Sequence, residues 1–398
     1  MPAKKLKDPD PVSPRDGHVL LMVGTMKGLF LLNSGPARKR WSISGPYFRG
    51  SSVYAANWDS RAGRHRIWAG PSSMHFGAEL CWTDDFGKRW ERPETPLVRF
   101  PAEAGASLAH IWQISPGRDD EPDALYCGVQ PSALFESRDA GKSWALNAGL
   151  WNHPHRAKWM PGGGGLCLHT VLVDPTRRGR LIVASSTGGA YRSDDGGKSW
   201  NVKNRGVRAE FLPDPYPEFG QCVHKIVGQG ARPERLYLQN HWGLYRSDDA
   251  GDSWHDMANG VPSDFGFCMG IHPRDADTAF ILPLHSDGFR CVPEGKLRVY
   301  RTRDGGKSWT ALTRGLPQKN AYETVLRDAL AVDALDPAGV YFGTRSGKLY
   351  GSPDEGRGWQ LIRDGLPPVI CVKAAIVANL SQRKSRAAKT RRRSRKAA

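Results

Sequence analysis

A short pattern, Ser/Thr-x-Asp-x-Gly-x-x-Trp, recurs six times in this chain at nearly constant spacing. The tryptophans that end successive copies are 54, 56, 54, 55 and 50 residues apart. A period of this length is typical of β-propellers, in which each repeat forms one four-stranded blade. A degraded seventh copy, which keeps only Ser34 and Trp41, precedes the others. Seven repeats therefore account for the globular part of the chain, and the six complete copies span residues 83–90, 137–144, 193–200, 247–254, 302–309 and 352–359.

Each copy predicts a tight turn between two antiparallel strands. Asp and Ser/Thr side chains hydrogen-bond backbone groups inside turns, and glycine adopts positive φ without strain. The tryptophan opens the next strand and buries a large apolar surface against the neighbouring repeat. No segment shows a sustained 3.6-residue apolar period, so the sequence predicts few helices.

The first repeat lacks an innermost strand, because too few residues precede Val19. The chain end supplies a spare apolar run over residues 369–377, and docking it into the first repeat removes an exposed sheet edge. We therefore predict an all-β fold, a seven-bladed β-propeller of four-stranded antiparallel blades over residues 18–379, closed by this C-terminal strand. Residues 1–17 and 380–398 are expected to be disordered ends. Two smaller β-domains are the alternative, which the even spacing disfavours.

The repeated pattern resembles the Asp-box, or BNR, repeat of sialidases, xyloglucan-active glycosidases, sortilin-type receptors and photosystem II assembly factors. The resemblance implies a propeller of the sialidase-like or glycosyl hydrolase-like kind, with the boxes as structural turns away from the ligand face. It does not extend to a sialidase site. The chain has no Phe/Tyr-Arg-Ile-Pro motif and no recognisable cluster of three arginines that would grip a carboxylate.

Composition favours a cytoplasmic location. No apolar run of signal-peptide length lies near the amino end, and no run of about 18 apolar residues occurs that would span a membrane. The seven cysteines show no close-spaced pairing pattern, so we expect free thiols in a reducing compartment.

The chain end is strongly basic. Residues 381–398 contain nine Lys and Arg and no acidic residue, and they supply about half of the net charge of +17. Such a run binds phosphate backbones non-specifically, or it is a solvated end that aids solubility. No aromatic residue interleaves with the charges to stack on bases, which favours the second interpretation.

Two long connections predict a ligand face at one mouth of the central channel. They cover residues 150–165 and 208–221, and both are longer than a hairpin requires. Their Pro and aromatic content favours ordered lids, although loops that only plug the channel are the simpler alternative. With three further loops of the same face they supply the candidate ligand-binding residues His153, His155, Trp159, Tyr216, His241, Trp242, His285, Tyr322 and Arg327.

Aligning the innermost strands on their Asp-Pro ends places His110, His169 and His224 at one position in three consecutive repeats, with Asp328 there in the seventh. Equivalent positions of adjacent blades lie side by side, so we expect the three imidazoles to converge and to be candidate ligands of a divalent metal ion. Cys167 and Cys222, two residues upstream of two of these histidines, share the same strand face. The alternative is that the histidines hydrogen-bond one another, water and carboxylates without a metal, since no spacing motif forces coordination.

Carboxylates on the same predicted face are candidate acid–base groups. They are Asp328, Glu218, Asp214 and Glu323. A glycosidase needs two such groups on either side of the bond it cleaves. The sequence therefore supports two functions. One is a platform that binds a small polar ligand or a peptide in the channel mouth and acts in assembly or maturation. The other is a glycoside hydrolase-like enzyme or a metal-assisted hydrolase or lyase.

Overall fold

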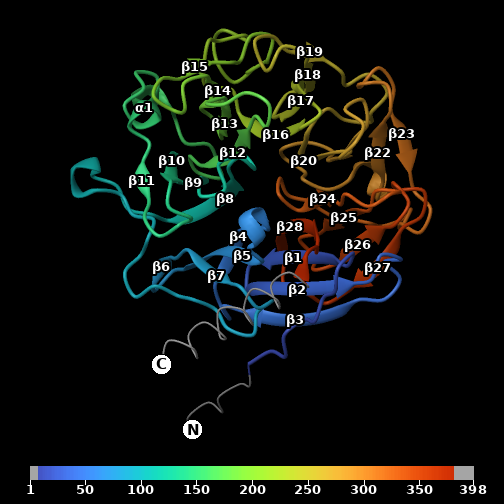
Figure 1. Cartoon of the computed structure of the whole chain (residues 1–398). Helices are drawn as coiled ribbons and strands as arrows, with labels where there is room; N and C mark the ends of the chain where they lie inside the picture. The colour runs from blue at the N-terminus through green and yellow to red at the C-terminus, as the bar shows by residue number, and fades with distance from the viewer. Residues whose placement is uncertain (1–7, 381–398) are drawn as a thin grey trace, which may run out of the picture.

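The computed structural model describes residues 8–380, which form seven antiparallel sheets arranged as blades around a central channel (Figure 1). From the first blade to the seventh, the innermost strands are β28 (Val369–Ile376), β4 (Ser52–Asp59), β8 (His110–Pro116), β12 (Leu168–Val173), β16 (Val223–Gln229), β20 (Gly266–Ile271) and β24 (Leu330–Val332). The second strands are β1 (Val19–Thr25), β5 (Arg66–Ser73), β9 (Leu125–Gln130), β13 (Leu181–Ser185), β17 (Arg232–Asn240), β21 (Ala279–Pro283) and β25 (Val340–Gly343).

The outer half of each blade completes the sheet. The third strands are β2 (Gly28–Ser34), β7 (Cys81–Thr83) with the short β6 (Gly77–Ala78), β10 (Ala133–Ser137), β14 (Gly189–Ser193), β18 (Leu244–Ser247), β22 (Val299–Thr302) and β26 (Leu349–Ser352). The outermost strands are β3 (Ser42–Tyr47), β11 (Ala145–Leu146), β15 (Asn201–Val202), β19 (His255–Asp256), β23 (Thr310–Leu312) and β27 (Gln360–Arg363). In the second blade, the outermost strand is reduced to a single bridge between Trp82 and Glu91.

Helix is scarce among the described residues, as the sequence predicts. The helical segments are α1 (Ala148–Trp151) and the 3-10 turns η1 (Arg61–Gly63), η2 (Ala102–Ala104), η3 (Arg156–Lys158) and η4 (Pro293–Gly295). None of the helices in residues 8–380 is long and apolar enough to cross a membrane. All seven cysteines are free thiols, which confirms that expectation.

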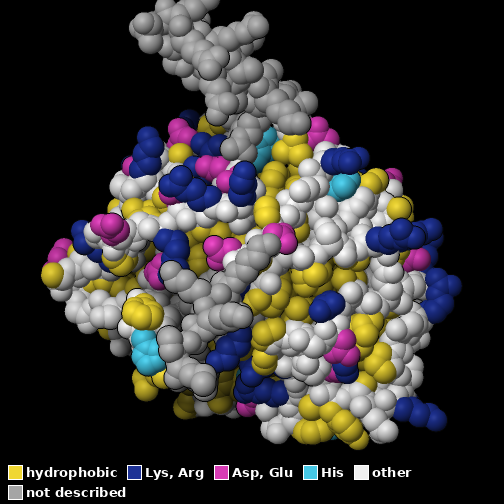
Figure 2. All heavy atoms as spheres, turned by 90° about the horizontal axis from the view of Figure 1, so that it is seen from below, with side chains coloured by type: hydrophobic (Ala, Val, Ile, Leu, Met, Phe, Trp, Pro, Cys, Tyr) yellow, Lys and Arg dark blue, Asp and Glu magenta, His cyan; other side chains and the backbone are white. Residues whose placement is uncertain are grey.

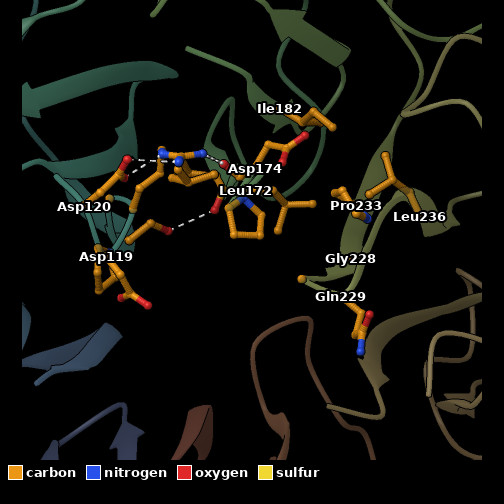
Figure 3. A pocket seen from close by; sticks show the side chains of 17 residues that line it. Asp119, Asp120, Leu172, Asp174, Ile182, Gly228, Gln229, Pro233 and Leu236 are labelled. Atoms are coloured by element: carbon orange, nitrogen blue, oxygen red, sulfur yellow. Dashed lines mark hydrogen bonds and ion pairs between the residues drawn. The ribbon is translucent and has the colours of Figure 1, made fainter. Parts of the chain in front are cut away.

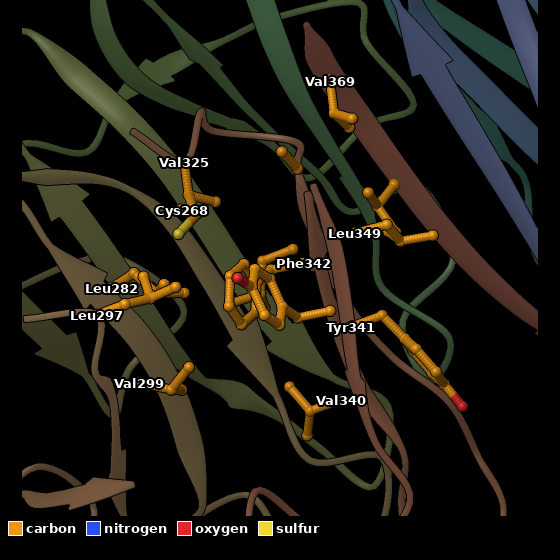
Figure 4. Packing of buried hydrophobic residues seen from close by; sticks show 14 of the residues in the cluster. Cys268, Leu282, Leu297, Val299, Val325, Val340, Tyr341, Phe342, Leu349 and Val369 are labelled. Carbon is orange, nitrogen blue, oxygen red and sulfur yellow. The ribbon is translucent and has the colours of Figure 1, made fainter. Parts of the chain in front are cut away.

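The predicted ring closure is confirmed. β28 is the innermost strand of the first blade and pairs antiparallel with β1, from Val19 opposite Ile376 to Thr25 opposite Val369. A large core joins this closing strand to the sixth and seventh blades (Figure 4). In it Phe342 stacks on Tyr350 with ring centroids 5.1 Å apart, and Val369 of the closing strand is fully buried.

The prediction of a disordered amino end is wrong for residues 8–17. Val12 is only 6% exposed and belongs to an apolar cluster with Trp58 and Val377, against which Leu380 packs. The backbone N–H of Gly17 donates to the carbonyl of Val377 at 2.8 Å. The burial of Val12 and this backbone hydrogen bond order the otherwise polar segment. The rest of that prediction, and the polyanion-binding role of the basic end, concern residues 1–7 and 381–398, which lie outside the described residues.

The six complete patterns form one hydrogen-bonded turn repeated around the ring. In each, the Ser/Thr hydroxyl donates to the Asp carboxylate at 2.7–2.8 Å and accepts the glycine N–H at 2.8–3.1 Å. The same carboxylate accepts a backbone N–H four residues on, at 2.9–3.0 Å. The Ser/Thr hydroxyl, the Asp carboxylate and the glycine N–H of each turn thus have partners within the turn.

Strand order distinguishes the two ends of the channel. Because neighbouring strands alternate in direction, the repeated turns between third and fourth strands lie at the end of the channel where the innermost strands finish. We call this the lower face, and the opposite end, where the innermost strands begin, the upper face.

The rim beside β3, which is turned toward the viewer in Figure 2, carries basic, acidic and apolar side chains interspersed without a continuous charged field.

Candidate functional site

β-Bulges near the upper ends of the innermost strands decide which side chains are equivalent. In β12 the pairing passes from Leu168 to Thr170, and in β16 from Val223 to Lys225, so that His169 and His224 occupy the bulges. In β8 the pairing passes from Ile111 to Gln113. The residue equivalent to the two histidines is therefore Trp112.

The expected register of His110 is thus wrong by two residues. It lies one position before Ile111, so its equivalents are Cys167 and Cys222. The reason is that Pro116 pairs with Leu125 in the way that Val173, and not Pro175, pairs with Leu181. An alignment that equates Pro116 with Pro175 therefore displaces His110 by two residues.

A cavity of about 590 Å³ lies at the upper mouth, beside blades four to six. The two long loops that the sequence singles out contribute to its walls. The lining residues are Lys158, Met160, Pro161, Gly162, Gly163, Gly164, Ser186, Thr187, Phe211, Leu212, Phe219, Gly220, Cys222, His224, His241, Trp242, Phe267, Asp287, Arg290 and Arg327. Of the predicted ligand-binding residues, His241, Trp242 and Arg327 therefore lie in one cavity, together with the predicted metal ligand His224.

One wall of this cavity is aromatic. The rings of Phe211 and Trp242 lie 4.9 Å apart at an interplanar angle of 33°, and Trp242 also contacts the His241 ring at 4.3 Å. Phe211 is 48% exposed, which is unusual for so large an apolar side chain. Two adjoining, accessible aromatic faces form a platform for a flat or ring-shaped apolar surface.

The cavity also carries positive charge. The Arg327 guanidinium lies 5.4 Å from the Trp112 ring and 5.7 Å from the Phe267 ring, and its buried Nε has no hydrogen-bond partner among the described residues. The Arg290 guanidinium lies 5.3 Å from the Phe267 ring and pairs with Asp287. Arg327 is thus a half-buried cation whose Nη1 lies 3.7 Å from Cys167 Sγ and which pairs with no carboxylate of the cavity lining.

Beneath the cavity, Asp328 anchors three strands. Its Oδ1 accepts hydrogen bonds from the Nζ atoms of Lys225 in β16 and Lys373 in β28, both at 2.7 Å. Burial alone would raise the pKa of Asp328, but the two ammonium groups hold it well below its ordinary value. This carboxylate does not line the cavity and stays ionised, so its expected role as an acid–base catalyst gives way to that of an ionic anchor at the ring closure.

The other three predicted catalytic carboxylates do not line the cavity either. Glu323 is buried and accepts hydrogen bonds from Lys348 at 2.8 Å and Ser346 at 2.6 Å. Glu218 is exposed, with its Oε2 3.8 Å from His155 Nε2. Asp214 caps its own loop by accepting the N–H of Tyr216. The structure therefore does not bring these carboxylates together as a catalytic pair.

Three predicted ligand-binding residues support the first long loop from behind. His155 Nδ1 and Trp159 Nε1 lie 3.2 and 3.1 Å from the Tyr191 hydroxyl, and the His153 ring lies 5.1 Å from the Tyr191 ring. His155 also stacks on Phe219 at 4.2 Å, which joins the first loop to the second. These contacts position Lys158 and Met160 at the cavity. Tyr216, Tyr322 and His285 are exposed and do not belong to its lining.

The three predicted metal ligands do not form a common ligand set. His169 is fully buried, with Nε2 2.9 Å from the Val223 carbonyl and Nδ1 3.0 Å from the Thr170 hydroxyl. His110 packs against the Tyr54 ring at 5.0 Å. Among the described residues, the group of cysteine, histidine and acidic side chains whose donor atoms lie within 4.8 Å of one another is instead Cys222, His224 and His241.

Burial and positive charge set the protonation of this group. Burial lowers the pKa of His224 well below its usual value, and Arg327 lowers it further. Burial also lowers the pKa of His241, although Asp287 opposes the shift. Burial raises the pKa of the Cys222 thiol, and Arg327 acts in the opposite direction. Both imidazoles are therefore neutral near pH 7.

Sequence reasoning missed Phe267 and Arg290. Phe267 lies at the irregular pairing of β20, between Gly266 and Met269, where the neighbouring strands have bulged histidines. Arg290 follows the loop that begins at His285, which the sequence singles out for its histidine and not for its charge. A search for arginines next to long loops would have found Arg290.

A second cavity, of about 560 Å³, opens on the lower face between β8, β12 and β16 (Figure 3). Most of its charged groups are already paired. Arg118 contacts Asp120 at 2.8 Å and donates to the backbone carbonyl of Asp174 at 3.2 Å, and the Ser115 hydroxyl donates to the Val171 carbonyl. The walls are otherwise mostly apolar, with Leu172, Ile182 and Leu236 among them.

No protein-family model matches the chain. In sequence it is similar to a xyloglucanase of a Paenibacillus species, with 25% identity over 278 residues that cover 62% of this chain and 26% of the relative. It is also similar to the oligoxyloglucan-reducing end-specific xyloglucanase of Emericella nidulans, with 22% identity over 256 residues covering 57% and 30%. The matched part thus spans less than a third of the length of these curated relatives.

Solved structures support the fold. A GH74 enzyme of Niastella koreensis superposes with a TM-score of 0.50 at 12% identity, covering 94% of this chain and 70% of that one. YCF48 bound to a D1 peptide superposes with a TM-score of 0.50 at 15% identity, covering 88% and 87%. At this identity the likeness concerns the propeller alone. The sequence relatives are xyloglucanase-like propellers.

Proposed function

We propose that the protein is a glycoside hydrolase-like propeller that binds a saccharide bearing an acidic group in the upper cavity. The observation that carries the proposal is the combination of an accessible aromatic wall, Phe211 and Trp242, with the unpartnered Nε of Arg327 in one cavity. The sequence similarity to xyloglucanases supports a saccharide as the class of ligand.

The aromatic wall supports ring recognition. The apolar face of a sugar ring packs on an aromatic side chain, which excludes water from both surfaces. Ser186 and Thr187 of the cavity lining carry hydroxyl groups, which are both donors and acceptors, and the Thr187 hydroxyl already donates to the Ser186 carbonyl. A polyhydroxylated ligand needs this combination of an apolar platform and adaptable polar groups.

The charge of the cavity supports an acidic substituent. Arg327 and Lys158 line it without an ion pair to any cavity carboxylate, whereas Arg290 is bound to Asp287. A guanidinium forms strong hydrogen bonds to carboxylate, phosphate or sulfate oxygens. An acidic ligand in the cavity would gain the Arg327 guanidinium as a charged hydrogen-bond donor.

Hydrolysis of a glycosidic bond is the second candidate, and the names of the sequence relatives favour it. The two-carboxylate chemistry of glycosidases needs two acidic groups beside the bond. Asp287 lines the cavity and forms an ion pair with Arg290, and it is the candidate nucleophile or base. The partner acid would come from a neighbouring loop, where Asp264 lies and pairs with Arg208.

We also assign the repeated turns to the Asp-box class. The shared hydrogen bonds of the six Ser/Thr, Asp and Gly positions support this assignment. It implies that these turns act in folding and not in ligand binding.

Calorimetric titration tests the proposal. We expect oligosaccharides that contain uronic acid to bind the full chain, and the matched neutral xyloglucan oligosaccharides to bind at least tenfold more weakly. Arg327→Gln should weaken acidic-ligand binding by about 10- to 100-fold, because a charge-assisted hydrogen bond contributes about 1.5–3 kcal/mol. Arg303→Gln, on an exposed strand end, is the control. Equal binding of both oligosaccharides by the wild type and Arg327→Gln would contradict the proposal.

Release of reducing ends from the same oligosaccharides separates the two candidates. Turnover that Asp287→Asn abolishes would establish hydrolysis. Binding without turnover would leave recognition as the function of the cavity. Binding of peptides but of no saccharide would overturn both.

A further inference from the structure

Three side chains of the fifth blade place one sulfur and two imidazole nitrogens close together at the cavity wall. Cys222 lies immediately before β16, His224 occupies its bulge, and His241 follows the end of β17. One donor atom of each lies within 4.8 Å of the donor atoms of the others. All three line the upper cavity, so the group is accessible from it.

Hydrogen bonding prepares His224 to be a ligand. Its Nδ1 lies 2.6 Å from the Gly266 carbonyl, which only accepts, so Nδ1 carries the proton. The lone pair of Nε2 is then free and lies 3.6 Å from Cys222 Sγ. A backbone carbonyl behind a histidine is the usual support of a metal-binding imidazole, because it fixes the tautomer and the ring orientation.

The separation of sulfur and nitrogen fits coordination. With zinc–sulfur and zinc–nitrogen bonds of about 2.3 and 2.0–2.1 Å at tetrahedral angles, the two donor atoms lie about 3.6 Å apart. The observed Sγ–Nε2 distance is 3.6 Å. A thiol–imidazole hydrogen bond has a similar length, but it gives no reason for a third donor, His241, to lie beside the pair.

The carboxylate of Asp287 lies next to the His241 ring. Its Nε2 lies 3.9 Å from Asp287 Oδ2, and its ring packs against Trp242 and Phe265 at 4.3 and 5.1 Å. A carboxylate next to a ligating histidine raises its basicity and offsets the charge of a cation. Asp287 thereby also counteracts the repulsion that Arg327 and Arg290 exert on a metal ion.

We propose that Cys222, His224 and His241 bind a zinc-type divalent ion, with its fourth coordination position open to the upper cavity. A set of one thiolate and two imidazoles selects borderline-soft ions such as zinc over magnesium or calcium. Binding replaces the thiol proton of Cys222 with a metal–sulfur bond and releases that proton to solvent. Three protein ligands and an open position are the arrangement of zinc sites that contact a ligand, since purely structural sites have four protein ligands.

This inference goes beyond the proposed saccharide site and is tested without a saccharide. The full chain is stripped with a chelator, dialysed and titrated with cobalt(II), followed by displacement with zinc(II). We expect one equivalent to bind, with the intense visible bands of tetrahedral cobalt and a near-ultraviolet sulfur-to-cobalt charge-transfer band.

Four variants locate the site. Cys222→Ser should remove the charge-transfer band, and His241→Gln should weaken cobalt binding at least tenfold. The controls are Cys291→Ser, which alters the other half-buried cysteine, and His285→Gln, which alters an exposed histidine outside the cavity. Both should bind as the wild type does. Far-ultraviolet circular dichroism and thermal melting establish that each variant is folded.

Two results would overturn the inference. One is the absence of stoichiometric cobalt binding by the folded wild type; the other is a charge-transfer band that survives in Cys222→Ser. Saccharide binding by the chelator-stripped protein distinguishes this failure from that of the proposed function, because Arg327, Phe211 and Trp242 do not depend on the ion.

Discussion

The lower and upper faces of this propeller are built from the same seven repeats, yet they differ in how regularly their connections repeat. On the lower face six turns repeat one set of hydrogen bonds, and Arg118 in the lower cavity is paired within the protein. On the upper face the connections do not repeat, and the buried Arg327 Nε has no partner among the described residues. The comparison teaches that the repeated turns form the scaffold, whereas the connections that depart from the repeat form the cavity that we propose as the recognition site.

The largest expected effect concerns the anchor below the upper cavity. Asp328→Asn should lower the free energy of unfolding by about 3–5 kcal/mol, because it leaves the buried Lys225 and Lys373 without their counter-ion. Chemical denaturation measures this loss. The exposed Glu94→Gln is the control and should change stability by less than about 0.5 kcal/mol. A loss below 1 kcal/mol for Asp328→Asn would show that the closing strand does not depend on this ion pair.

A matched pair of tryptophans contrasts the two faces directly. Trp200 of a repeated turn is 5% exposed and donates to Asn147 and to the Gly197 carbonyl, so Trp200→Phe should cost about 2 kcal/mol of stability. Trp242 of the cavity is half-buried, and Trp242→Phe should cost less than about 1 kcal/mol. Thermal and denaturant unfolding of the two variants gives the comparison. The reverse order of stability losses would contradict the division into scaffold and site.

The turn carboxylate should matter for stability and not for the ligand. Asp195→Ala removes hydrogen bonds from Ser193, from the Ser199 hydroxyl and from the Ser199 N–H, and it should cost about 1–2 kcal/mol. Calorimetric titration of the variant should give the wild-type affinity for an acidic oligosaccharide. A weakened affinity at unchanged stability would place the turn in the binding site.

The smallest expected effect is a decline of stability in acid. Hydrogen bonds from Ser143 and Ser199 hold the pKa of Asp139 and of Asp195 at about 2, below the usual value of an aspartate. A depressed pKa adds stability above the unfolded value and loses it as the pH falls from about 4 toward 2. Both carboxylates are near the surface, so the decline is shallow. Denaturant unfolding across this range should show a smaller decline in the double variant Asp139→Asn/Asp195→Asn, and an equal decline would contradict the assignment.

The fold was predictable because its signals are local and repeated. The turn at residues 193–200 needs no knowledge of the rest of the chain, and the missing strand before Val19 matches the spare one at 369–376. The site was predictable only in part. The long loops identify the upper face, and His241, Trp242 and Arg327 do line its cavity.

The remaining features depend on tertiary detail. Pro116 occupies the strand position of Val173 and not that of Pro175, so counting back from the proline places His110 wrongly. The partners of Asp328 come from two other blades, more than 40 residues away in the sequence, which no local pattern reveals. Whether a carboxylate is free or ion-paired is likewise decided by such distant contacts.

Hydrogen–deuterium exchange with and without an acidic oligosaccharide tests the central claim most directly, because it reports every loop of both faces in one measurement. The account predicts slower exchange on binding in residues 158–164, 211–222, 239–243 and 287–290 around the upper cavity. The six repeated turns and the lower-cavity segments 115–120 and 228–233 should exchange at unchanged rates. Protection confined to the lower segments or to the repeated turns would contradict the assignment of recognition to the upper face.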